Sequence, residues 1–306
     1  MSRGNLEIAN RLIVMRECDQ KIRQRVYRAY CREKNLRLAQ GVYIDSNYYH
    51  DLPFWDQHRL RALACGASRV RIVAGISAAM LWEMWVIANP ATPVEYYLAR
   101  GRKEQETPGR RLSGALPEDD YLAGARVCVT TRARTIFDLA NIHGYQTCFV
   151  AASSVLAQNP ENMEELAAFA DRSETLARVL RDVDTRVESP AEAAFLAQVC
   201  EEGIFRVIPQ VSIIDGQGTM RRADFQIHKT NVLVEVSGLG KYGTTEADQR
   251  YRVDRAAGRL DALATAGYRI WAYSAQQVFS GEAYRDARRR YLAAREAGYP
   301  LYPRLE

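Results

Sequence analysis

The stretch from Met220 to Trp271 constrains the fold of this chain more than any other. Its apolar runs and breaks predict, in order, a strand, a short turn, a strand, a loop, a charged helix and a strand. Asp224 lies in the first strand, and Glu235 ends the apolar run of the second. Two carboxylates on adjacent strands can share one Mg²⁺, which prefers oxygen ligands. The sequence therefore predicts a metal site on this hairpin, with solvent-facing edge acids as the alternative.

The residues around the two acids resemble a known family. The segment RRADFQIHKTNVLVEVSG, the charged helix after it and the closing AGYRIW are similar to small PD-(D/E)XK nuclease domains related to very-short-patch repair endonucleases. The likeness covers about residues 186–280 and implies a restriction-endonuclease-like mixed sheet flanked by helices. It also implies that Asp224 and Glu235 bind Mg²⁺ or Mn²⁺. Glu192, on the first helix, would be an accessory acid, and Gln210 would lie on the strand before the hairpin.

One position departs from the family pattern. Two residues after the glutamate, the superfamily has Lys and this subgroup often has Asp, whereas this chain has Ser237. Lys241 is the candidate to reach back to the site, and Lys229 in the turn is a poorer one. Glu192 also has a structural explanation, because it stands in the capping-box position after Ser189. An active nuclease and a decayed, non-catalytic one both remain open.

The length of 306 residues suits two or three domains, and we expect boundaries near residues 90 and 185. The predicted parts are a winged-helix-like head (1–90), a β-rich connector with a helical middle domain (91–185) and the nuclease-like domain (186–306). Their formal charges are uneven: +8 over residues 1–112, −5 over 113–185 and +2 over 186–306. A basic head is compatible with DNA contact, and solvated helix faces are the alternative.

The head carries two helical patterns and then a short ribbon. The second helix, from Gln20 to Lys34, is basic, and the ribbon contains LRLAQGVY. This order resembles the winged helix-turn-helix of AbiEi-type antitoxin-like proteins, as do the stretches SAAMLWEM and TRARTIFDLA further on. The resemblance implies that the basic helix and the ribbon contact DNA, since arginine binds phosphates and guanine edges bidentately. The candidate DNA contacts are Arg23, Arg25, Arg28, Arg32 and Arg37 in the head and Arg221, Arg222 and Arg255 in the last domain.

The six cysteines are scattered, with no CxxC pair and no histidine at zinc spacing. They indicate reduced thiols in a cytoplasmic protein rather than disulfides or a structural zinc site. We also expect no signal peptide, and no apolar run approaches the ~20 residues that span a bilayer. A membrane partner is therefore not expected.

These features predict a DNA-binding protein with a metal-dependent endonuclease domain, from a bacterial defence, repair or mobile-element system. In that hypothesis Glu192, Asp224, Glu235 and Lys241 form the catalytic set, and Asp224 and Glu235 hold Mg²⁺ or Mn²⁺. The alternative is a catalytically inactive, antitoxin-like transcriptional regulator. DNA is the expected partner; a toxin or another defence-system protein, and a homodimer, remain open.

Overall fold

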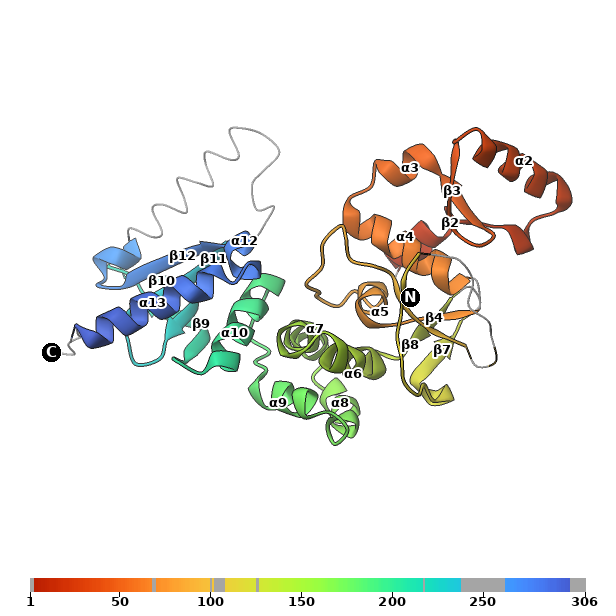
Figure 1. Ribbon diagram of the computed structural model, residues 1–306. Helices are drawn as coiled ribbons and strands as arrows, with labels where there is room; N and C mark the ends of the chain where they lie inside the picture. The colour runs from red at the N-terminus through yellow and green to blue at the C-terminus, as the bar shows by residue number, and fades with distance from the viewer. Residues whose placement is uncertain are drawn as a thin grey trace. The chain divides into compact units, whose positions relative to one another are not determined.

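The computed structural model describes residues 3–67, 70–99, 101, 108–124, 127–216, 218–237 and 262–297. The chain separates into two compact units, drawn in Figure 1. The first comprises residues 1–155 and 159–180, and the second comprises residues 156–158 and 181–306. Both units are mixed α/β, which confirms the predicted fold class at this level.

The first unit begins with a small antiparallel sheet whose strand order is β1-β3-β2. Asp19 caps the second helix, because its carboxylate accepts a hydrogen bond of 2.8 Å from the amide of Ile22. Gly41 adopts φ 70° in the tight turn of the ribbon, a conformation that glycine takes without steric cost. The elements are α1 (Arg3–Ala9), β1 (Ile13–Val14), η1 (Met15–Glu17), α2 (Gln20–Cys31), β2 (Asn35–Ala39), β3 (Val42–Asp45), α3 (Ser46–His50) and α4 (Phe54–Ala67).

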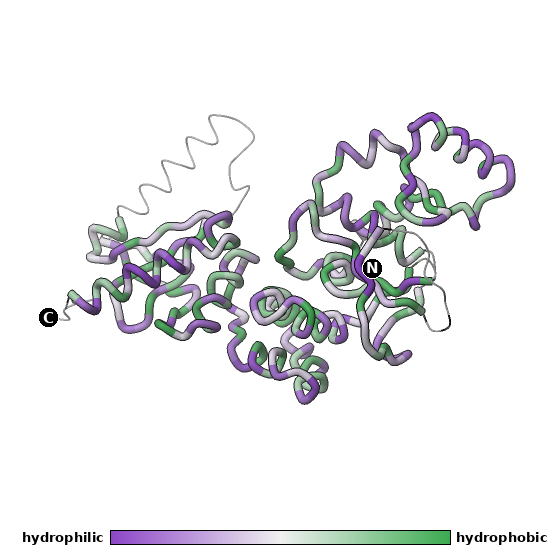
Figure 2. The backbone as a smooth tube through the Cα atoms, in the orientation of Figure 1, coloured by the Kyte–Doolittle hydropathy of each residue, from purple (hydrophilic) through white to green (hydrophobic). Residues whose placement is uncertain are grey.

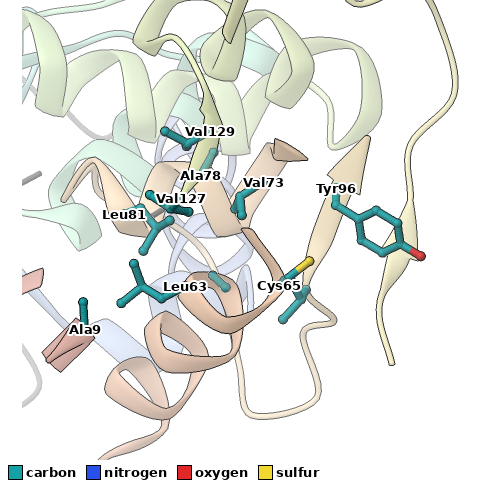
Figure 3. Close-up of a cluster of buried hydrophobic side chains, with 11 residues drawn as sticks. Ala9, Leu63, Cys65, Val73, Ala78, Leu81, Tyr96, Val127 and Val129 are labelled. Carbon is teal, nitrogen blue, oxygen red and sulfur yellow. The ribbon is translucent and has the colours of Figure 1, made fainter. Parts of the chain in front are cut away.

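A five-stranded mixed sheet follows, in the order β6-β5-β4-β8-β7. Strand β4, before residue 90, pairs with β5 and β8, after it, so the expected head and connector share one sheet. Figure 3 shows their common core, where Leu63, Val73, Leu81 and Val127 gather. The elements are β4 (Arg71–Val73), α5 (Gly75–Leu81), β5 (Glu95–Leu98), β6 (Arg110–Arg111), η2 (Glu118–Asp120), β7 (Tyr121–Ala123) and β8 (Cys128–Thr130).

His58 of α4 is a neutral, buried histidine in this core. It is 1% exposed, and its Nε2 lies 2.8 Å from Oγ of Ser77. Burial, and next the charge of Arg61, lower the pKa of His58 to about 4.

Acid is therefore expected to weaken the first unit. The unfolded chain protonates His58 near pH 6.5 and the folded chain only near 4, so stability is lost as pH falls through this window. Between pH 7 and pH 5 this group should cost about 2 kcal/mol of unfolding free energy. Urea unfolding at both pH values should show a smaller loss for His58→Gln. Equal losses in the variant and the parent would contradict this role.

Arg134 of α6 is the centre of a second buried polar group. Its side chain, 3% exposed, donates hydrogen bonds to Asp138 at 2.8 Å, Asp120 at 2.6 Å and the hydroxyl of Tyr97 at 3.0 Å. The hydroxyl of Thr131 accepts a hydrogen bond from the amide of Arg134 and caps the helix, and the Arg134–Asp138 pair spans one helical turn. The helices that complete this unit are α6 (Arg132–Ile142), α7 (Tyr145–Gln158), α8 (Asn162–Ala170) and α9 (Glu174–Asp182).

The second unit has a four-stranded mixed sheet in the order β12-β11-β10-β9. The first three strands along the chain are antiparallel, and β12 runs parallel to β11. Phe195 of α10 packs against Phe225 and Tyr273 on one face of this sheet. The elements are α10 (Pro190–Glu202), β9 (Val207–Ile214), β10 (Met220–Ile227), β11 (Val232–Ser237), β12 (Arg269–Ser274), α12 (Ala275–Phe279) and α13 (Glu282–Glu296).

The predicted strands of this hairpin are confirmed, since β10 and β11 occupy residues 220–227 and 232–237. The charged helix predicted between β11 and β12 falls mostly on residues outside the described ones. None of the helices described here is long and apolar enough to cross a bilayer.

Candidate metal and nucleic-acid site

The acid pair lies on neighbouring strands. Phe225 of β10 pairs with Val234 of β11, and Asp224 and Glu235 are the next residues along these strands beyond that pair. Neighbouring strands of a sheet lie about 4.8 Å apart. Both side chains are partly buried. The two carboxylates predicted to share a cation therefore stand on adjoining strands, each next to a paired residue.

Asp224 lies where the hairpin departs from a regular ladder. Its Oδ2 accepts a hydrogen bond of 2.7 Å from the amide of Val236, so a side chain takes the place of a main-chain acceptor. Ala223 belongs to a buried cluster with Leu233, whereas Phe225 contacts Phe195. Residues two apart on a regular strand share one face, so β10 changes face at Asp224. This irregularity directs the carboxylate toward β11 and Glu235.

Glu192 and Gln210 continue the row of polar side chains away from the acid pair. Gln210 stands opposite Asp224, because Pro209 pairs with Phe225 and the strands stay in step. The Gln210 amide donates a hydrogen bond of 2.8 Å to Oε2 of Glu192. Glu192 of α10, Gln210 of β9 and Asp224 of β10 thus lie on successive neighbouring elements, and Glu235 lies on the next strand.

Glu192 is 4% exposed and fully engaged in hydrogen bonds. Its carboxylate accepts from the hydroxyl of Ser189 at 2.7 Å and from the amide of Glu188 at 2.9 Å, besides Gln210. The predicted capping role is present, because the hydroxyl of Ser189 in turn accepts from the amide of Glu192. Ser189 is thus the N-cap of α10, and the Glu192 carboxylate orients both the Ser189 hydroxyl and Gln210.

Gln210 has a strained backbone that the sequence did not reveal. Its φ is 53°, a left-handed value that costs a residue with a side chain roughly 1–2 kcal/mol. Such strain persists where surrounding contacts overrule it, and it is frequent at functional sites. Here the hydrogen bond to Glu192 and the pairing of Pro209 and Val211 hold Gln210 in place. The neighbouring proline is the one local signal, and it does not specify this conformation.

Ser237, at the position where the family has Lys or Asp, has a structural partner. Its hydroxyl donates to the carbonyl of Tyr273 at 3.2 Å and ties β11 to β12. It shares a face with Glu235, two residues earlier on the same strand. Lys241, the candidate for the missing cation, lies outside the described residues, as does Arg255.

The two arginines predicted for the hairpin are paired with acids. Arg221 donates to Asp215 at 2.9 Å, and Asp215 is 4% exposed, so this pair stabilises the β9–β10 turn. Arg222 donates to Glu188 at 2.6 Å in an exposed ion pair. Exposed pairs contribute little to stability, so the Arg222–Glu188 pair adds little to the fold.

The five arginines predicted to contact DNA in the head are exposed, and Figure 2 shows α2 as largely hydrophilic. Arg25, Arg28 and Arg32 recur at helical spacing and share one side of α2. Arg23 has a structural contact, because its Nε donates to the carbonyls of Met15 and Cys18 at 2.8 and 2.9 Å. Arg37 lies on the ribbon strand β2.

The donor chemistry of the acid pair fits a hard divalent cation. Two carboxylates on adjoining strands supply charged oxygen ligands, and Mg²⁺ commonly takes one or two carboxylates and keeps several waters. Within the described ranges, no group of three or more His, Cys, Asp and Glu side chains is arranged to hold a metal ion. Comparison of the sequence with models of protein families and with curated proteins finds no match.

Proposed function

We propose that this chain binds DNA through its N-terminal head and hydrolyses phosphodiester bonds in its second unit with Mg²⁺ or Mn²⁺. The observation that carries the proposal is the β10–β11 hairpin, on which Asp224 and Glu235 stand next to the paired residues Phe225 and Val234. Gln210, hydrogen-bonded to Glu192, lies on the strand beside Asp224. Two carboxylates on adjoining strands supply the charged oxygen ligands that a hard divalent cation prefers.

Each residue has a defined task in this mechanism. Asp224 and Glu235 would hold the cation, and the amide of Val236 orients Asp224. A cation bound there polarises the phosphate and lowers the pKa of a bound water. Glu192 orients the amide of Gln210, which stands beside Asp224. Lys241 is the candidate to stabilise negative charge that develops on the phosphate.

Support for DNA contact by the head comes from its topology and its charge. Its elements follow the order helix, strand, short turn, helix, strand, strand, with the sheet order β1-β3-β2, which is typical of a winged helix. In such folds the helix before the ribbon enters the major groove. That helix is α2, whose exposed side carries Arg25, Arg28 and Arg32.

Replacement of Arg25, Arg28 and Arg32 together by Gln is expected to weaken duplex binding and its dependence on salt. Each lost phosphate contact should reduce the slope of log affinity against log salt by about 0.9. Fluorescence anisotropy at several salt concentrations measures both quantities. The matched control is Arg16→Gln, an exposed arginine outside α2. An unchanged slope in the triple variant would contradict the assignment of α2.

A catalytically inactive, antitoxin-like regulator is the second candidate. Ser237 favours the regulator, because its hydroxyl donates a hydrogen bond to the carbonyl of Tyr273 and no lysine stands at that position. Supercoiled, linear and single-stranded DNA should be incubated with the purified chain in Mg²⁺, Mn²⁺ or EDTA. The nuclease proposal requires cleavage with at least one of the cations and none in EDTA. Binding without cleavage under every condition would refute it and favour the regulator.

A further inference from the structure

A second polar site lies at the outer edge of the same sheet. A cavity of about 560 Å³ opens between β12 and the first half of α13. We call it the arginine pocket, since three of its lining residues are arginines. Residues that line it include Ala272, Tyr273, Arg285, Asp286, Arg289 and Arg290.

Asp286 holds two guanidinium groups in this pocket. Its carboxylate accepts hydrogen bonds from Nε of Arg290 at 2.7 Å, from Arg289, and from the hydroxyl of Tyr273 at 2.9 Å. The Asp286 side chain is 16% exposed, whereas that of Arg289 is 77% exposed. The carboxylate thus fixes the guanidinium groups of Arg289 and Arg290. The guanidinium of Arg290 also lies over the ring of Trp271. Preorganised guanidinium groups lose less entropy when they bind an anion.

These contacts leave guanidinium N–H donors of the three arginines for a ligand. Arg285 donates to the carbonyl of Ser280, and each of the three arginines has one hydrogen bond within the described part of the chain. A guanidinium has five N–H donors. With Glu282 and Asp286 as the two acids against three arginines, the pocket keeps a surplus of one positive charge. One phosphodiester group carries one negative charge and matches this surplus.

The arginine pocket lies one strand away from Glu235, at the edge of the sheet. In the parallel register of β11 and β12, Glu235 stands beside Ala272, which lines the pocket, on strands about 4.8 Å apart. Tyr273, the next residue of β12, points to the opposite face, where it contacts Asp286 of α13. The short helix α12 turns the chain, so that α13 starts beside the end of β12, as Figure 1 shows.

We propose that the arginine pocket binds a backbone phosphate of the nucleic acid on which the second unit acts. The ligand class is a polynucleotide phosphodiester, and the inference rests on the proposed nuclease function. The pocket binds the backbone irrespective of sequence, because guanidinium–phosphate contacts carry no base information. It fixes the position of the nucleic acid on the second unit.

The test compares Arg285→Gln/Arg289→Gln with Arg288→Gln in the full chain. Arg288 is an exposed arginine of the same helix and does not line the pocket. Cleavage of a short duplex with Mg²⁺ should show KM raised about tenfold in the double variant and kcat within about twofold, because a positioning contact is lost. The slope of log KM against log salt should also change by about 1 to 2. Arg288→Gln should change KM by less than about twofold.

Binding without cations separates this inference from the function on which it rests. Anisotropy in EDTA reports duplex affinity even if the chain cleaves nothing. A weaker affinity in the double variant alone supports the pocket, whether or not cleavage occurs. Equal affinity and equal KM in the double variant and Arg288→Gln would overturn the inference, and Asp224-dependent cleavage would then still stand. Circular dichroism checks that the exposed substitutions leave the fold intact.

Discussion

Asp224→Asn is expected to reduce the rate of Mg²⁺-dependent DNA cleavage about a thousandfold, and Glu235→Gln is expected to reduce it by a similar factor. Asparagine and glutamine keep the shape of the side chain but remove its charge, so the cation loses half of its anionic ligands. A thousandfold loss corresponds to about 4 kcal/mol in the barrier, which is the scale of charge stabilisation by a bound cation. Initial rates on the DNA that the parent chain cleaves best, at saturating Mg²⁺, measure the effect.

The matched control is Glu202→Gln, a carboxylate at the exposed end of α10 in the same unit. It should retain the parent rate, and all three variants should keep the parent melting temperature within a few degrees. Cleavage by Asp224→Asn at the rate of Glu202→Gln would show that the hydrolytic site lies elsewhere.

Arg134→Met is expected to destabilise the first unit by about 3–5 kcal/mol. The substitution leaves Asp138, which is 2% exposed, and Asp120 without their cation, and a buried unpaired carboxylate is the costly case. It also removes the donors that reach Tyr97 and the carbonyl of Ala115. Chemical unfolding followed by circular dichroism gives the loss of unfolding free energy. The loss is read from the transition of the first unit.

The unfolding free energy lost in Arg134→Met should be smaller in acid. Burial already raises the pKa of Asp138 to about 6, although Arg134 opposes this shift. A carboxyl with a raised folded pKa stabilises the fold at low pH, and that contribution is lost as pH rises toward the folded value. Without Arg134 the pKa rises further, so Arg134→Met should be less impaired at pH 5 than at pH 8. Arg28→Met, an exposed arginine of α2, is the control; an equal effect of both substitutions would contradict the buried role.

Local patterns sufficed to predict the hairpin and its acids. The β-branched run before Glu235 can hardly form anything but a strand, and the short turn after β10 leaves antiparallel pairing as the simple outcome. The spacing of Asp224 and Glu235 around that turn then places them on adjoining strands. Thr131 and the Arg134–Asp138 pair were likewise predictable, because caps and pairs one turn apart depend on local geometry.

Contacts between distant segments were not predictable in the same way. The left-handed backbone of Gln210 depends on Glu192 and on the strands beside it, and no local pattern specifies it. Arg221 was expected to face phosphate, but its partner Asp215 is set by the β9–β10 turn. The sheet that joins residues before and after position 90 forms by pairing across α5, and composition alone does not indicate such pairing.

The most direct measurement of the central claim is a calorimetric titration of Mn²⁺ into the parent chain, Asp224→Asn, Glu235→Gln and the double variant. If both carboxylates hold one ion, the parent binds one Mn²⁺ at this site. Each single variant then loses at least about tenfold in affinity, and the double variant loses less than the two single losses combined. Mn²⁺ binding with the same affinity in all four proteins would contradict the claim that Asp224 and Glu235 form a metal site.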